Sequence, residues 1–267
     1  MAKIDPKDVM ALRRKSGLGL MECKAALEKA NGDMVIAEDN MRKDGLSKMD
    51  GRIDRNASDG CIAVAATDDL SKCAIVEINS ETDFTAKNDS FVAMAIEIAQ
   101  LALRQPAGDV EKTNEMQNRV DDLRVTTKEN VTWRRGIVLD GGQIGTYVHH
   151  DRKTGVAVQV DRKIDNTVLR KLCLHVASAD PAPLCVNVAG VPEDVLAKER
   201  EIAMAQATKS SKPDAIVEKM VDGKIAKFLD GVVLLRQPFV MDGNNRIMDL
   251  LPNGVTIQRF VKYTVGR

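Results

Sequence analysis

Apolar side chains recur at steps of three and four residues through the first 46 positions, which is the spacing of short amphipathic helices. Asp5 and Asp33 stand where helix N-caps are expected, and Gly17 follows the first apolar run as a stop signal. Residues 1–46 are therefore predicted to form a three-helix bundle whose third helix ends at Gly45. Because so few residues bury only a thin core, we expect one exposed apolar edge. Such an edge is usually a docking surface, and the alternative is a bundle that only caps the fold.

Residues 47–59 are polar and charged, and they are predicted to be a linker. Beyond them the apolar residues follow the spacing of strands, and helical spacing then returns. The elements predicted for this first unit, residues 60–140, are a hairpin of strands at 61–66 and 73–78, a helix from about Ser90 that stops before Pro106, a helix around Val120 and Leu123, and a strand at 133–139.

The same order recurs in a second unit, residues 141–267. A hairpin at 144–148 and 155–160 comes first, and a helix that ends before Pro181 follows it. A closing strand at 256–265 matches the last strand of the first unit. The chain is therefore predicted to be an α+β protein with a duplicated core of antiparallel sheets.

The second unit holds an insertion at about residues 190–230. Two helices are predicted at 192–207 and 214–229, joined by a polar turn at 209–213. So short a turn makes them an antiparallel helical hairpin. It either projects from the core as a contact arm or packs back on the sheet, and its apolar residues are compatible with both.

Composition narrows the classes of partner. The chain has 267 residues, with 39 Lys and Arg against 39 Asp and Glu, so it has no overall pull toward phosphate backbones. One Trp and two Tyr are too few for stacking platforms, and we expect no direct binding of nucleic acid. Residues 1–10 are charged where a signal peptide would be apolar, and no run is long enough to span a membrane. A cytoplasmic protein without membrane contact is expected.

Residues that would carry catalysis or bind metal are sparse. The five cysteines are widely spaced and form no CxxC pair, so they are predicted to be small buried apolar residues in a reducing compartment. The phosphate-binding glycine loops and the GxSxG and HExxH motifs do not occur in the sequence. His149 and His150 are predicted to point to opposite faces of a strand. We therefore expect no cofactor, no metal site and no catalytic residues.

Phe84 is the residue that fits a plain loop least, because polar residues surround it between a strand and a helix. Considered alone, Thr82 or Asp83 caps a turn and Phe84 folds inward onto the core, which loop chemistry favours. The alternative is an exposed aromatic side chain that has a task at the surface.

Several segments together resemble the signatures of the bacterial elongation factor Ts family. These segments are 17–27 (GLGLMECKAAL), 31–33 (NGD), 81–88 (ETDFTAKN), 147–150 (YVHH) and 237–240 (QPFV). They span nearly the whole chain in the family's order. Thr85 stands where the family usually has Val, Leu20 where it often has Met, and Ser16 where Thr is usual.

The resemblance implies a ubiquitin-associated-like N-terminal domain, a duplicated α+β core and a projecting helical hairpin. It also implies a guanine nucleotide exchange factor that binds elongation factor Tu and releases its GDP without covalent chemistry. The resemblance further implies that the chain contacts two surfaces of elongation factor Tu. It is also compatible with a homodimer of this chain within a heterotetramer. By this resemblance the exchange wedge, which displaces the partner's Mg²⁺, consists of Thr82, Asp83, Phe84 and Thr85.

The residues that the resemblance assigns to partner binding are Leu12, Leu20, Met21 and His149. Leu12 and Leu20 fit the bundle core equally well, whereas Met21 is out of phase with the buried face and is expected at the surface. His149 fits a strand position bonded to a backbone carbonyl as well as a contact. Two rival interpretations remain: an adaptor that binds a peptide through the bundle, and an enzyme that acts at His149 and His150.

Overall fold

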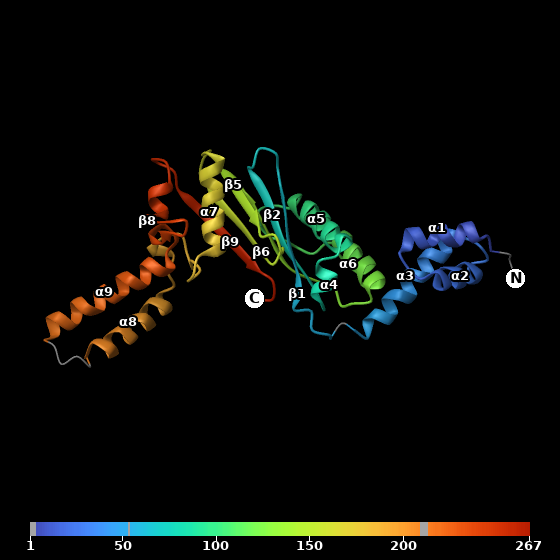
Figure 1. The fold of residues 1–267 in the computed structure, drawn as a ribbon, viewed down its shortest axis with the longest axis horizontal. Coiled ribbons are helices and arrows are strands. Elements are labelled where there is room, and N and C mark those ends of the chain that lie inside the picture. Colours follow the sequence, from blue (N-terminus) through green and yellow to red (C-terminus); the bar gives the residue numbers. More distant parts are fainter. Residues whose placement is uncertain (1–3, 53, 209–212) are drawn as a thin grey trace.

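The computed structural model describes residues 4–52, 54–208 and 213–267. Figure 1 shows an elongated molecule, with a bundle of helices at the N-terminal end, the strands in the middle and a pair of long helices at the other end. The predicted α+β class with antiparallel sheets is confirmed.

The N-terminal bundle consists of α1 (Pro6–Ser16), α2 (Leu20–Lys29) and α3 (Met34–Asp50). Asp5 and Asp33 accept backbone N–H bonds as N-caps, and Gly17 ends α1 with a φ of 68°. The predicted end of α3 at Gly45 is wrong, since the helix continues to Asp50 and occupies the first part of the predicted linker. A Cβ on Gly45 would lie 2.6 Å from a methyl group of Val125, so this glycine allows a close helix approach and does not act as a stop.

The first sheet has the strand order β1-β2-β4-β3, with every pair antiparallel. Two helices, α5 and α6, pack on its outer face around Phe91, Ile98 and Met116. The short β3 has too few residues to show a strand pattern. The bounds of this unit are β1 (Asp59–Ala66), β2 (Lys72–Ser80), α4 (Asp83–Ala86), α5 (Asp89–Leu103), β3 (Gly108–Asp109), α6 (Asn114–Thr127) and β4 (Thr132–Asp140).

The second sheet repeats this arrangement with the order β5-β6-β9. In both sheets a hairpin is extended by a later strand that pairs antiparallel with the second strand of the hairpin. Helix α7 covers the outer face through Leu169, Leu172 and Val176. The bounds are β5 (Gln143–Val148), β6 (Thr154–Val160), α7 (Asn166–Ser178) and β9 (Ile257–Thr264).

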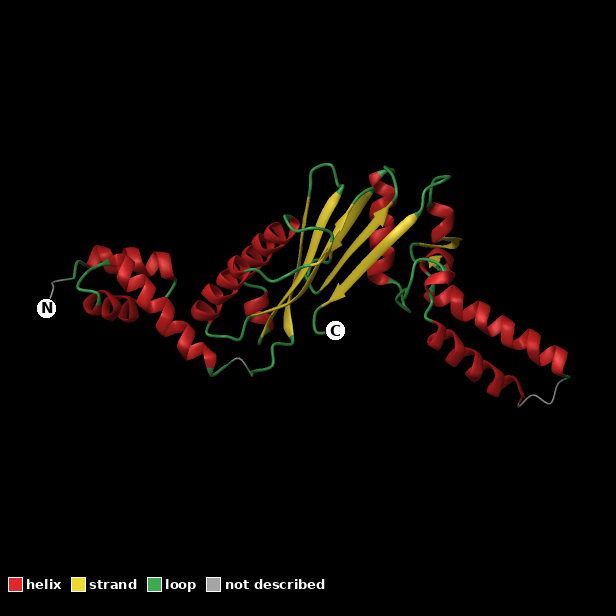
Figure 2. Cartoon of the chain, turned by 180° about the vertical axis from the view of Figure 1, so that it is seen from behind, coloured by secondary structure: helices red, strands yellow, loops and turns green. Residues whose placement is uncertain are grey.

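The two sheets pack against each other, so helices cover only their outer faces (Figure 2). Ile62, Ile75 and Ile144 belong to the apolar cluster between the sheets. A Cβ on Gly155 would lie 2.4 Å from a methyl of Ile62, so glycine permits the close approach of β6 to β1. Both halves of the duplication therefore contribute to one buried apolar cluster between the sheets, in addition to the cluster that each half forms under its own helices.

Helices α8 (Glu193–Thr208) and α9 (Asp214–Val232) pack antiparallel through small and branched residues such as Ala203, Val217 and Val221. They extend away from the sheets (Figures 1 and 2), so the alternative of a hairpin packed on the sheet is wrong. Most of the predicted turn at 209–213 lies outside the described residues. Short elements connect the hairpin to the core: η1 (Val188–Gly190), η2 (Leu234–Arg236), β7 (Pro238–Phe239), β8 (Asp242–Arg246) and η3 (Ile247–Leu250). Within the described chain, no helix is both long and apolar enough to cross a membrane.

Candidate functional site

Phe84 lies on α4, a one-turn helix directly after β2, and 84% of its surface is exposed. Thr82 is the N-cap, and its hydroxyl accepts a hydrogen bond from the Thr85 N–H over 3.3 Å. The predicted cap at Thr82 is therefore present, but the inward position of Phe84 that local chemistry favoured is wrong. The next buried side chain is Ala86, whose small size keeps the turn against the core while Phe84 points outward.

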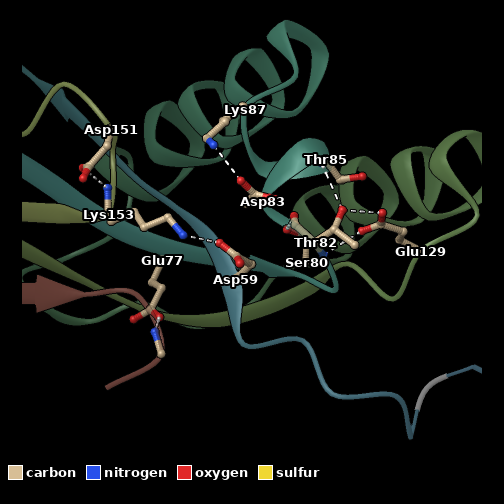
Figure 3. A network of polar contacts seen from close by, with 11 residues as sticks. Asp59, Glu77, Ser80, Thr82, Asp83, Thr85, Lys87, Glu129, Asp151 and Lys153 are labelled. Atoms are coloured by element: carbon tan, nitrogen blue, oxygen red, sulfur yellow. Dashed lines mark hydrogen bonds and ion pairs between the residues drawn. The ribbon is translucent and has the colours of Figure 1, made fainter.

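Two glutamates connect this turn to the loop that precedes β4, and Figure 3 shows the one on that loop, Glu129, beside Thr82. The Glu129 carboxylate accepts the Thr82 hydroxyl at 2.7 Å and the Thr82 N–H at 3.1 Å. In the opposite direction, Glu81 accepts the Asn130 N–H at 2.7 Å. Hydrogen bonds to ionised carboxylates are stronger than neutral ones, so α4 is held from outside its own segment. The motifs contained no signal for Glu129, which lies 47 positions from Thr82.

Asp83 is ionised and already paired. Lys87, one turn further along, donates a 2.6 Å hydrogen bond to its carboxylate. That bond, with the charges of Lys87 and Lys153, holds the pKa of Asp83 below its usual value. The same bond raises the pKa of Lys87. The site therefore presents an aromatic ring beside a carboxylate that stays charged at neutral pH.

Residues of the turn after β5 lie close to this site. Lys153 forms an ion pair with Asp59 at the start of β1, and its charge acts on Asp83 (Figure 3). The Arg152 carbonyl accepts a 2.7 Å hydrogen bond from the Ile62 N–H, which fixes the turn against β1. The structure thus places the β5–β6 turn, which carries His149, next to α4.

His149 and His150 do not lie on a strand, because β5 ends at Val148. The predicted opposite orientation is wrong, since their ring centroids are 4.3 Å apart in the turn. The Tyr147 hydroxyl lies 2.8 Å from Nδ1 of His149, so the alternative of a bond to a backbone carbonyl is replaced by a side-chain bond. His149 is half-buried and His150 is exposed.

The N-terminal bundle has the exposed apolar edge that its small core predicts. Met21 is 73% exposed and Leu20 is 44% exposed, and Val35 and Ile36 are exposed as well. Leu12 lies in the bundle core with a side chain that is 0% exposed, so it does not belong to this exposed edge. In Figure 1 the bundle stands apart from α4, so these residues form a second surface separate from Phe84.

The cysteines are part of the packed interior. All five cysteines are free thiols and four are buried, with Cys185 half-buried. Burial raises the pKa of Cys61, Cys73 and Cys173 to about 12, so these thiols are poor nucleophiles. Across the described ranges, His, Cys, Asp and Glu side chains do not gather in groups of three that could hold a metal ion.

The Gln237 segment is a packing motif near the base of the hairpin. Its side-chain amide donates to the Gly231 carbonyl at 2.6 Å and the Pro181 carbonyl at 2.9 Å. Its oxygen accepts a 2.9 Å hydrogen bond from Nε2 of the buried His175. Gln237 therefore joins α7, α9 and the connection between them.

Known proteins resemble this chain over its full length. A family model described as Elongation factor TS matches residues 81–267, which include α4, the β5–β6 turn and the helical hairpin. The elongation factor Ts of Psychrobacter sp. (strain PRwf-1) is 39% identical over 100% of this chain and 92% of its own length. That of Methylococcus capsulatus (strain ATCC 33009 / NCIMB 11132 / Bath) is 41% identical over 97% of this chain and 90% of its own length.

The chain belongs to the elongation factor Ts family. It is accordingly a translation elongation factor of the nucleotide exchange type. The full-length relatives also cover the N-terminal bundle, which the family model does not reach. The elongation factor Ts resemblance of the sequence motifs is confirmed.

Proposed function

We propose that this chain binds elongation factor Tu in its GDP form and releases the nucleotide by inserting Phe84 as a wedge. The observation that carries the proposal is the 84% exposure of Phe84 on a turn that Thr82 and Glu129 hold in place. A large aromatic ring kept in water is unfavourable for this chain alone. Burying it in a partner recovers about 2 kcal/mol.

The wedge acts on the partner's metal and phosphate site. A GTPase holds GDP through a phosphate loop and a Mg²⁺ ion that requires near-ideal octahedral geometry. A small displacement of the surrounding elements therefore weakens the nucleotide considerably. Asp83, ionised and adjacent to Phe84, brings a negative charge toward those surroundings. Thr82 and Thr85 supply the capped turn that presents both side chains.

The exposed edge at Leu20 and Met21 is proposed as a second contact, and His149 as a contact beside the wedge. By linkage, an exchanger that weakens GDP binding is itself bound more weakly when GDP is present, so GTP completes the cycle. The role needs no covalent chemistry by this chain, and its proposed place of action is the cytoplasm. The homodimer within a heterotetramer stays a prediction. Light scattering of the mixed proteins tests it by measuring the molar mass of the complex.

Release of fluorescent GDP from purified elongation factor Tu tests the proposal. The wild-type chain is expected to accelerate release strongly, and Phe84→Ala is expected to lose most of the acceleration. Met241→Ala is the matched control, because Met241 is also exposed (64%) but lies in the β7–β8 connection. A folded wild-type chain that leaves the release rate unchanged would contradict exchange and favour the adaptor interpretation.

A further inference from the structure

The hydroxyl of Thr82 takes part in two hydrogen bonds at once. It has a single proton, which it donates to Glu129 Oε1 over 2.7 Å. Its lone pair accepts the Thr85 N–H over 3.3 Å, and that bond caps α4. Because the proton is directed at the carboxylate, the lone pair is left facing the Thr85 N–H. Glu129 therefore sets the direction of the cap.

The same carboxylate also fixes the backbone at this point. Its second oxygen accepts the Thr82 N–H at 3.1 Å, and the Ser80 hydroxyl donates to the Thr82 carbonyl at 3.0 Å. Glu81, next to Thr82, accepts a hydrogen bond from the N–H of Asn130, which is next to Glu129. Two chain segments far apart in sequence are thus linked in both directions directly beside α4.

A helix of one turn does not persist in water by itself, because nucleation fixes several residues for a single hydrogen bond. An exposed phenylalanine adds a tendency to collapse onto the nearest apolar surface. The outward position of Phe84 consequently needs support from outside the turn.

We propose that Glu129 is a positioning residue for nucleotide exchange: its carboxylate orients the Thr82 hydroxyl and so preorganises α4 with Phe84 ready to enter the partner. This inference rests on the proposed function, because it names the residue that prepares the wedge. The role assigned to Glu129 involves no contact with the nucleotide. Its contribution is the ordering of α4 before the partner is met, and such preorganisation reduces the cost of association.

The variants Glu129→Ala and Thr82→Val remove the two partners of the same hydrogen bond. In each, the concentration giving half-maximal GDP release is expected to rise at least about tenfold, because both variants lose the hydrogen bond between the Thr82 hydroxyl and the Glu129 carboxylate. The maximal rate should change much less, because α4 reforms in the complex. Thr82→Ser, which keeps the hydroxyl, should lose less than Thr82→Val. Glu111→Ala, an exposed loop glutamate on the same unit, is the control and should behave as wild type.

A double variant separates coupling from general damage. Because the hydrogen bond between the Thr82 hydroxyl and Glu129 is absent from both single variants, Glu129→Ala with Thr82→Val should lose clearly less than the sum of the two single losses. Fully additive losses would overturn the proposal. So would a Glu129→Ala variant with the wild-type concentration dependence. Glu129→Gln keeps the side-chain volume and one acceptor oxygen, and an intermediate loss is expected for it.

Amide hydrogen exchange of Thr85 provides a readout independent of the partner. The Thr85 N–H is expected to exchange about tenfold faster in Glu129→Ala than in wild type, with unchanged protection of β2. If wild type fails to release GDP while this protection is lost, the exchange function is wrong and the role of Glu129 in ordering α4 stands. Unchanged protection of Thr85 in Glu129→Ala overturns the positioning role whatever the GDP assay shows.

Discussion

The guanidinium of Arg135 donates a 2.7 Å hydrogen bond to the carboxylate of Glu77, whose side chain is 1% exposed. Arg135 also lies 4.3 Å from the centroid of the Tyr263 ring and donates to the carbonyl of Arg267 at 2.6 Å. Glu77 accepts the Gly266 N–H as well. The pair therefore joins β2 and β4 of the first sheet to the end of the second.

Arg135→Met should destabilise the chain by about 3 kcal/mol, because it leaves the Glu77 carboxylate buried without its partner. Urea unfolding followed by circular dichroism measures the difference. Arg134→Met is the matched control, since Arg134 is the exposed neighbour on the same strand, and it should cost under about 0.5 kcal/mol. Equal effects of the two substitutions would show that the pair does not tie the sheets together.

His175 should make the stability of the chain depend on pH. Its Nδ1 accepts the Val240 N–H at 3.3 Å and its Nε2 donates to Gln237, so the neutral ring is the form that fits. Burial lowers the pKa of His175 below its ordinary value. The unfolded chain then binds more protons than the folded chain, so this stabilisation is complete above about pH 6.5 and is lost as the pH falls through the lowered pKa.

The comparison of His175→Gln with wild type isolates this contribution. Between about pH 7 and pH 5, the free energy of unfolding should fall less steeply in His175→Gln than in wild type. His150→Gln, which changes an exposed histidine, should keep the wild-type slope. Identical slopes in all three proteins would contradict the assignment of a neutral His175.

Alanine at position 45 should be tolerated only if the Val125 side chain moves away or is made smaller. In an exposed helix, Gly→Ala stabilises by up to about 1 kcal/mol. Here the new Cβ would lie 2.6 Å from Val125, so we expect Gly45→Ala to destabilise the chain or to separate α3 from α6. In the Val125→Ala background the same substitution should stabilise, as thermal unfolding would show. A stabilising effect in the wild-type background would mean that the two helices do not pack closely in solution.

If the charge of Asp83 acts on the partner's Mg²⁺ surroundings, Asp83→Asn should reduce the maximal GDP release rate about tenfold. A tenfold change corresponds to the free energy of roughly one charged interaction. Because Lys87 holds the pKa of Asp83 below its usual value, wild-type release should not lose this contribution between pH 8 and about pH 5. Stopped-flow fluorescence measures both. Asp68→Asn, in the exposed β1–β2 turn, is the control. A wild-type rate for Asp83→Asn would remove its charge from the mechanism.

The local elements could be predicted because their causes lie within a few residues. The N-caps at Asp5 and Asp33, the strand spacing of the hairpins and the helical spacing of α5, α7 and α9 depend on neighbours in sequence. The α+β class and the repeated order of elements follow from the same short-range signals. The exposed edge of the bundle follows from the small number of residues available for its core.

Exposure and contact were decided by the tertiary structure. Leu12 is buried and Phe84 is exposed, although the spacing left Leu12 open and local chemistry favoured an inward Phe84. Gly45 lies inside a helix, at the point where Val125 of another helix packs closely against it. Glu129 holds Thr82 across 47 positions of sequence. Periodicity determines which residues share a face, whereas burial depends on what the rest of the chain packs against that face, and only the folded chain specifies those partners.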